Sequence, residues 1–228
     1  MTLFGTNKRL QRTAQSRSPL NRVVRMMTKQ RKKAARKQAI EQANRLLAAN
    51  PVFVDLETTG LKPAESRIIE IALVNQYGGI LLDTLISPEI PGFEGDAATP
   101  AEGVNRITYD MLRGAPSWAH VLPLVNLALV KYGVLCSYNI KFDAAFLRSQ
   151  GAQLGAENGI PLFCIMECFA QFYGEWNEKY RSWRWQSLGV ACECFDIINS
   201  MPHRAAGDAE AARQVLVAIA EGRKPCKI

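Results

Sequence analysis

The chain carries two carboxylates, Asp55 and Glu57, at the end of an apolar run, and a turn rich in hydroxyl groups follows them. Side chains alternate between the two faces of a strand, so a strand over these residues places both acids on one face. Two carboxylates this close repel each other unless a cation lies between them. Clusters of oxygen ligands of this kind suit Mg²⁺ or Mn²⁺.

Two further acids and a histidine stand where predicted elements begin. Asp143 follows a predicted strand over residues 133–138, and Asp208 opens the last predicted helix, shortly after His203. Sites in open α/β sheets form beyond the carboxyl ends of strands, where these groups are expected to meet. Each residue alone is more often a helix cap, a solvated acid or a surface histidine. Together and in this order they indicate a metal site built from four carboxylates.

The hydrophobic pattern predicts an α/β fold in which strands come first and then alternate with helices. The expected strands cover residues 52–56, 68–75, 80–87 and 133–138, with a hairpin between the second and the third. The expected helices cover residues 142–150, 165–175, 184–195 and 208–221, with shorter ones capped by Thr108 and Ser117. Residues 88–103, which are rich in proline and glycine, are expected to form a long loop.

The charge is distributed unevenly along the chain. Residues 1–50 carry a net charge of +12 and residues 51–228 one of −5, within a total of +7. We expect a flexible tail over residues 1–19 and a basic amphipathic helix, continuous or broken, over about 20–49. The predicted organisation is therefore a basic N-terminal arm, residues 1–50, followed by one α/β domain, residues 51–228.

The composition excludes several classes of protein. Hydrophobic residues make up 48% of the chain, which indicates a globular protein rather than a disordered one. No apolar run is long enough to cross a bilayer, and the start lacks the apolar segment of a secretory signal. The six cysteines form no CxxC pair, which favours reduced thiols and a cytoplasmic location. Association with the nucleoid is compatible with this location, and the Arg-rich start leaves mitochondrial import as the lesser alternative.

Three segments resemble the motifs of the DEDDh (DnaQ-like) 3′→5′ exonucleases, which include the proofreading epsilon subunit of bacterial replicative polymerases and ribonuclease T. The segments are F-V-D-L-E-T-T-G-L from Phe53, N-x-x-F-D from Asn139 and H-x-x-x-x-D from His203. The resemblance covers about residues 52–221. It implies a ribonuclease H-like fold, with a five-stranded mixed sheet flanked by helices.

The resemblance also implies a catalytic site. Two divalent metal ions, Mg²⁺ or Mn²⁺, would be held by Asp55, Glu57, Asp143 and Asp208. His203 would be the general base, since an imidazole can accept a proton near neutral pH. Two metals about 4 Å apart can stabilise both the attacking and the leaving oxygen of a phosphodiester.

The same resemblance implies contacts to the substrate. The backbone of Thr58, Thr59 and Gly60 would hold the terminal nucleotides, and Leu61 would wedge between them or be a plain exposed turn residue. Asn139 and Phe142 would position the substrate backbone. The chain departs from the family at Tyr138, where many members have histidine, and at Val104-Asn105-Arg106-Ile107, where V-H-G-I is common. Neither departure removes a predicted metal ligand.

Aromatic and basic side chains are interleaved between residues 169 and 185. Such a segment can stack bases and hold phosphates, and Arg181 and Arg184 are the expected contacts. Alternatively, several of the rings pack the helical layer against the sheet.

The expected function is hydrolysis of phosphodiester bonds at 3′ ends of single-stranded nucleic acid, with DNA favoured, releasing nucleoside monophosphates. The alternatives are a 3′→5′ exoribonuclease of the same family and a non-catalytic protein that binds nucleic acid or docks on a polymerase. The expected partners are single-stranded DNA or RNA 3′ ends, with a DNA polymerase or another replication or repair protein as a further candidate, and no membrane. The basic arm would bind phosphates, remain a solvated tail or dock on such a partner, and the first of these is favoured.

Overall fold

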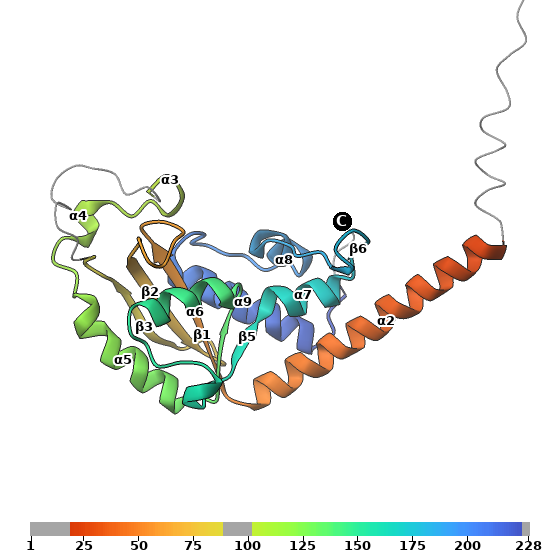
Figure 1. The fold of residues 1–228 in the computed structure, drawn as a ribbon, viewed down its shortest axis with the longest axis horizontal. Coiled ribbons are helices and arrows are strands. Elements are labelled where there is room, and N and C mark those ends of the chain that lie inside the picture. The colour runs from red at the N-terminus through yellow and green to blue at the C-terminus, as the bar shows by residue number, and fades with distance from the viewer. Residues whose placement is uncertain (1–18, 89–101, 225–228) are drawn as a thin grey trace, which may run out of the picture.

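The computed structural model describes residues 19–88 and 102–224, so the expected tail and most of the expected long loop lie outside the described residues. At its centre is a five-stranded sheet with the strand order β3-β2-β1-β4-β5 (Figure 1). The strands are β1 (Pro51–Thr58), β2 (Ile68–Asn75), β3 (Ile80–Leu85), β4 (Val134–Ser137) and β5 (Leu162–Cys164). β1 pairs antiparallel with β2 and parallel with β4, which confirms the predicted mixed sheet.

Helices cover both faces of this sheet (Figure 1). One face packs against α2 (Pro19–Ala48), α7 (Ile165–Tyr173), α8 (Leu188–Cys194) and α9 (Ala205–Ala220). The other face packs against α5 (Trp118–Lys131) and α6 (Ile140–Ser149). Along β1, Phe53 lies in the first of these cores and Val54 in the second, as the alternation of a strand requires. Asp55 and Glu57 continue the face of Phe53 and therefore point to the side of the sheet that α9 covers.

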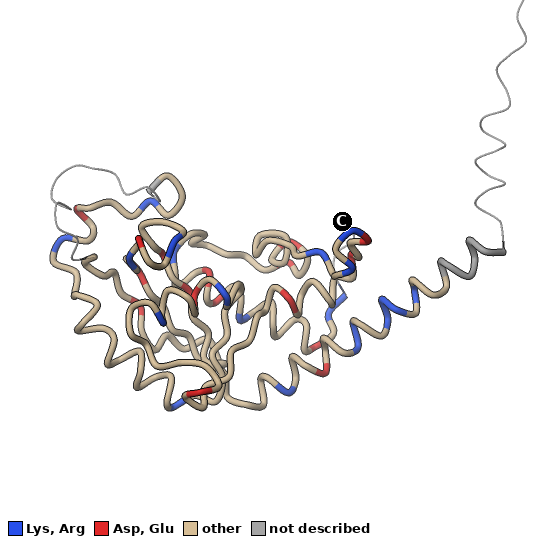
Figure 2. Tube along the Cα trace, in the orientation of Figure 1, with Lys and Arg blue, Asp and Glu red and all other residues tan. Residues whose placement is uncertain are grey.

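The long helix α2 is continuous and belongs to the domain along its C-terminal half. Ala39 and Ala43 are fully buried in the same core as α7 and α9. Small side chains at this spacing let two helices approach closely, and the Arg36 guanidinium also donates to the Phe172 carbonyl oxygen. Residues 26–34 are exposed, and basic side chains follow one another along this part of the helix (Figure 2). The described part of the basic arm is thus anchored in the core along its C-terminal half and exposed over residues 26–34.

The remaining described elements are short. They are α3 (Glu102–Asn105), α4 (Tyr109–Leu112), the 3₁₀ turn Ala156–Asn158, β6 (Trp176–Asn177) and β7 (Ser182–Trp183). Thr108 caps α4 as predicted, since its hydroxyl accepts from the Met111 N–H. Ser117 precedes α5 but makes no capping bond to the backbone, because its hydroxyl instead contacts the His120 ring. Among the described residues, no helix is long and apolar enough to span a membrane.

Three elements differ from the sequence prediction. The helix predicted over residues 184–195 is only α8, because the aromatic segment before it folds into the β6–β7 hairpin. The last helix begins at Ala205, which places Asp208 in its first turn rather than at its start. β5 was not predicted as a strand, since three residues are too few to show a hydrophobic period.

Candidate functional site

Three of the predicted acids converge at the carboxyl end of β1. Asp55 and Glu57 come from β1 and Asp208 from the first turn of α9, and one carboxylate oxygen of each lies within 4.8 Å of the others. β1 and α9 pack directly against each other, so the position of this trio is fixed by the core beneath it. A strand and a helix from opposite ends of the domain thus supply one cluster of oxygen ligands.

Asp143 lies beside this trio in the first turn of α6, directly after β4. It is buried, and its negative charge contributes to raising the pKa of Asp55. Its carboxylate accepts hydrogen bonds from the Ser137 hydroxyl, at 2.5 Å, and from the Leu56 backbone N–H. The fourth predicted acid is therefore next to the other three, with its carboxylate oriented by β4 and β1.

Burial raises the pKa values of all four acids, and the negative charges of neighbouring carboxylates raise those of Asp55, Glu57 and Asp208 further. Burial is the largest cause in each case, and it raises the pKa of Glu57 and that of Asp143 to about 7. The pKa of Asp55 is raised well above its usual range by burial and then by the charges of Asp143 and Asp208. The pKa of Asp208 is raised by burial as well. A divalent cation would offset both effects, and four carboxylates form the hard, all-oxygen ligand set that Mg²⁺ and Mn²⁺ prefer.

His203 lies on the loop that leads into α9. Its backbone adopts a left-handed conformation, with φ of 62°, and its N–H donates to Asp208 Oδ2 at 3.2 Å. The Asn199 side chain donates to the other oxygen, Asp208 Oδ1. A Cβ at Gly207 would lie 2.4 Å from the Met201 carbonyl oxygen, so only glycine allows this loop to fold so closely over the helix. The His203 side chain is therefore exposed, while its backbone is hydrogen-bonded to Asp208.

Sequence reasoning missed a buried ion pair next to this loop. Glu70 on β2 is 1% exposed and lies directly opposite Glu57 in the strand register. Its carboxylate accepts from the Arg204 guanidinium, at 2.9 Å from Nε, and from the Ala205 N–H at 3.0 Å. The pair joins β2 to the start of α9, between the predicted base and the predicted ligand. The signal was present in the sequence, since a single acid interrupts an otherwise continuous apolar strand.

Asn105 is a second missed residue, and it occupies one of the positions that depart from the family pattern. The side chain is 2% exposed, and its Oδ1 accepts from the Ile107 N–H at 3.1 Å. Among the described residues its Nδ2 has no regular hydrogen-bond partner, yet the Asn105 side chain lies close enough to Glu57 to oppose the rise in the pKa of that acid. Asn105 therefore aims a buried N–H₂ group at the acidic cluster.

The predicted substrate contacts around the first motif divide into two groups. The Thr58 hydroxyl donates to the Gly60 carbonyl oxygen, and the Thr59 hydroxyl accepts from the Arg67 N–H, so both hold the turn together. Leu61, at the end of that turn, is 83% exposed. The turn thus presents one apolar side chain to solvent beside the acids.

The predicted contacts of the second motif lie at the start of α6, next to Asp143. Asn139 is exposed and makes no side-chain capping bond to α6. Phe142 is half-buried, and its ring lies against Phe146, with the centroids 4.8 Å apart. Both predicted contacts are therefore accessible within a few residues of Asp143.

The aromatic segment is divided between buried and exposed rings. Phe169 and Phe172 are buried in the core, as the alternative interpretation expected, whereas Trp185 is 57% exposed. Arg184 pairs with Glu175, at 3.2 Å between Nε and Oε1, and Arg181 is exposed. Of the two predicted phosphate contacts, Arg184 is thus already engaged by an acid.

Comparisons with known proteins agree with this geometry. Residues 52–216 match the model of the exonuclease family designated RNase_T. An exonuclease of Escherichia phage 186, described as uncharacterised, is 29% identical over 80% of this chain and 94% of its own length. The PolC-type DNA polymerase III of Halalkalibacterium halodurans is 33% identical over 75% of this chain, which corresponds to 11% of the polymerase. The chain is thus similar in extent to the phage protein and to about a tenth of the polymerase.

Solved structures share the fold at low sequence identity. Escherichia coli exonuclease I in complex with a dA16 oligonucleotide superposes with a TM-score of 0.58 at 18% identity, over 77% of this chain and 42% of that one. A 3′-exonuclease described as recognising a histone mRNA stem-loop has a TM-score of 0.54 at 16% identity, over 78% of this chain and 84% of that one. These likenesses confirm the ribonuclease H-like fold.

Proposed function

Because the chain belongs to the RNase_T exonuclease family and carries its DEDDh (DnaQ-like) motifs, we propose that it hydrolyses single-stranded nucleic acid from the 3′ end. The main support is the cluster of Asp55, Glu57 and Asp208, whose oxygens lie within 4.8 Å of one another with Asp143 beside them. DNA is the favoured substrate, since PolC-type DNA polymerases are among the relatives and exonuclease I binds DNA oligonucleotides. The products would be nucleoside monophosphates.

The four acids would hold two divalent cations, Mg²⁺ or Mn²⁺. When bound, the cations would supply the positive charge that offsets the charge developing on the phosphate and on the attacking and leaving oxygens. Asp143 is oriented for this role by the Ser137 hydroxyl, and Asp208 is held by Asn199. The protein thus supplies ligands whose positions are set before the substrate arrives.

His203 would accept the proton of the attacking water as general base. Its exposure lets the imidazole reach a water beside the cluster, and the bond from its backbone to Asp208 keeps it near the acids. Arg204, which follows His203, is held in place by its ion pair with Glu70. Leu61, the last residue of the first motif, and Asn139, the first residue of the second, would position the terminal nucleotides.

The proposal is tested with matched DNA and RNA oligonucleotides that carry a 5′ label. With Mg²⁺ or Mn²⁺ we expect a ladder of products that shorten one nucleotide at a time, faster for DNA than for RNA. With EDTA we expect no products, because the acids would lack the cations that offset their repulsion. Internal cleavage, shortening from the 5′ end or full activity in EDTA would contradict the proposal.

The exoribonuclease alternative rests on the structural likeness to the 3′-exonuclease described as recognising histone mRNA. The 2′-hydroxyl is the group by which a protein distinguishes the two polymers. Faster digestion of the RNA strand in the same experiment would select this alternative. Binding of both strands without any digestion would instead select the non-catalytic alternative.

A further inference from the structure

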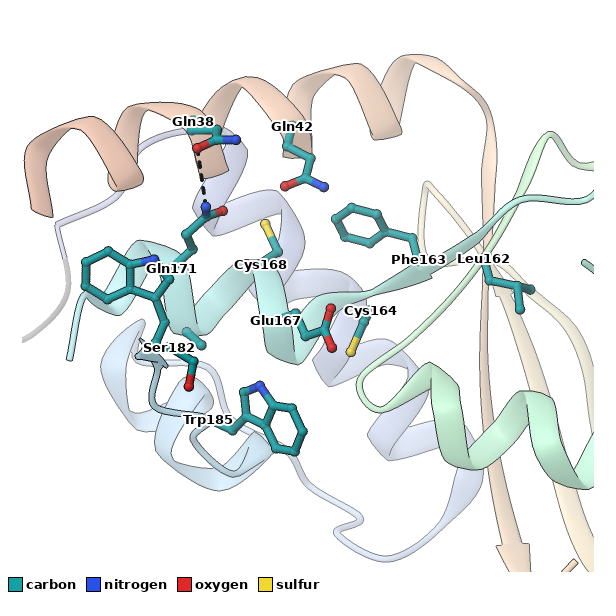
Figure 3. A pocket seen from close by; sticks show the side chains of 12 residues that line it. Gln38, Gln42, Leu162, Phe163, Cys164, Glu167, Cys168, Gln171, Ser182 and Trp185 are labelled. Carbon is teal, nitrogen blue, oxygen red and sulfur yellow. Dashed lines mark hydrogen bonds between the residues drawn. The ribbon is translucent and has the colours of Figure 1, made fainter. Parts of the chain in front are cut away.

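A groove opens on the side of the domain between α2, α7 and the β6–β7 hairpin (Figure 3). Its volume is about 600 Å³. Side chains from all three elements line it, including Gln38, Gln171, Glu167, Trp183 and Trp185. The residues that form the predicted catalytic site lie elsewhere, so the catalytic proposal leaves this groove without a role.

The lining of the groove combines flat rings with carboxamides. Trp185 is 57% exposed, so much of its indole ring is accessible to a ligand. The Gln171 amide donates to the Gln38 carboxamide oxygen at 3.3 Å, and both side chains lie on the groove wall in Figure 3. Indole faces stack on nucleobases whatever the sequence, and carboxamides offer both a donor and an acceptor to base edges. The lining is therefore suited to unpaired bases.

Two cationic side chains lie next to rings at the groove. The Lys141 ammonium lies 5.5 Å from the centroid of the Trp185 ring and pairs with Glu167 at 2.8 Å, which offsets the one acid in the lining. The Arg31 guanidinium stacks 3.2 Å from the centroid of Trp176 and lies 5.5 Å from that of Trp183, which lines the groove, and so ties the exposed, basic part of α2 to the hairpin. Figure 2 shows this basic stretch of α2 continuing away from the domain. A phosphate backbone that crosses the groove would therefore meet a cation near Trp185 and another near Trp183.

The groove is also joined to the catalytic site by direct contacts. Lys141 lies two residues before Asp143 on the same helix. The Tyr138 hydroxyl, from the residue before Asn139, donates to the carbonyl oxygens of Gln186 and Ser187, immediately after Trp185. A strand that passes Asn139 on its way out of the site therefore meets the Trp185 end of the groove first.

We propose that this groove binds unpaired bases of the nucleic-acid strand upstream of the terminal nucleotides, with Trp185 as the stacking platform, Lys141 beside that ring and Arg31 beside Trp183. The inference rests on the proposed function, since it takes the substrate to be single-stranded nucleic acid. The exposed basic half of α2 would follow the same strand further from the cleaved end.

The test compares Trp185→Ala with a control, Tyr77→Ala, which removes another exposed ring at the distant turn between β2 and β3. Binding of labelled oligothymidylates is measured in EDTA, where no hydrolysis is expected, and kcat and KM are measured with Mg²⁺. One substrate is a trinucleotide, and the other has about 12 nucleotides, within the usual range of single-strand sites. Thermal unfolding of each variant checks the fold.

We expect Trp185→Ala to weaken binding of the long strand and to raise its KM, each about tenfold, the usual effect of losing one stacked base. In Trp185→Ala, binding of the trinucleotide and kcat should not change. The Tyr77→Ala control should behave as the wild type, and Trp185→Phe should restore most of the binding of the long strand. If Trp185→Ala bound the long strand with wild-type affinity and KM, the inference would be overturned. Equal losses of affinity for the long strand and for the trinucleotide would overturn it as well. Digestion by the wild-type protein is read in the same assay, so a failure of the groove and a failure of the proposed function give different results.

Discussion

Asp55→Asn is expected to lower kcat for 3′-end hydrolysis by at least about 10³-fold, since metal-assisted stabilisation of the phosphate is worth several kcal/mol. Asn has the same shape as Asp but lacks the negative charge that a divalent cation needs. Asp55 is the residue whose pKa responds to all three other predicted ligands, so it lies at the electrostatic centre of the cluster. The measurement is single-turnover digestion of an oligonucleotide with Mg²⁺.

The control for this variant is Asp110→Asn, which removes an exposed acid that pairs with Arg113 on the surface. Removing a surface ion pair of this kind should leave activity unchanged. In EDTA the Tm of Asp55→Asn should not fall, because one of several mutually repelling buried charges is gone. Wild-type activity in a folded Asp55→Asn protein would show that the metal site is wrongly assigned.

His203→Gln is expected to lower kcat by about 10²- to 10⁴-fold with little change in KM, which is the usual contribution of a general base. Gln can donate and accept hydrogen bonds but cannot take up a proton near neutral pH. The His203 side chain is exposed, so the Tm should be unaffected. Rates are measured at saturating substrate with Mg²⁺.

The sequence contains one other histidine, which provides the matched control. His120 is exposed and contacts the Ser117 hydroxyl at the start of α5, away from the acids. His120→Gln should therefore digest the oligonucleotide at the wild-type rate. Equal losses in both variants, or none in His203→Gln, would rule out His203 as the base.

Much of the fold and the outline of the site could be predicted from the sequence. The alternation along β1 was enough to place Asp55 and Glu57 on one face, and the structure puts that face under α9. Periodic patterns found β2, β3 and α5 because each is long enough to show its period. Asp55 and Asp208 are far apart in the sequence, and the family motifs rather than any local pattern predicted that they share one site.

The parts that sequence reasoning missed depend on contacts between distant segments. The Glu70–Arg204 pair joins residues that are 134 positions apart, and neither has a local partner that would have suggested it. The burial of Ala39 on α2 was hidden by the surrounding charge, since a single alanine is a weak hydrophobic signal. The β6–β7 hairpin has strands of two residues each, too short for any pattern.

In the proposed mechanism, divalent cations held by the four acids act on the phosphate at the 3′ end. The most direct test is an oligonucleotide with a single phosphorothioate at its 3′-terminal linkage, digested as separate diastereomers. Sulfur is a poor partner for Mg²⁺ and a better one for softer ions such as Mn²⁺ or Cd²⁺. We predict that one diastereomer is cut much more slowly than the oxygen substrate in Mg²⁺ and that a softer ion restores the rate. If both diastereomers were cut at the same reduced rate with Mg²⁺ and with the softer ion, the proposed contact between a cation and this phosphate would be contradicted.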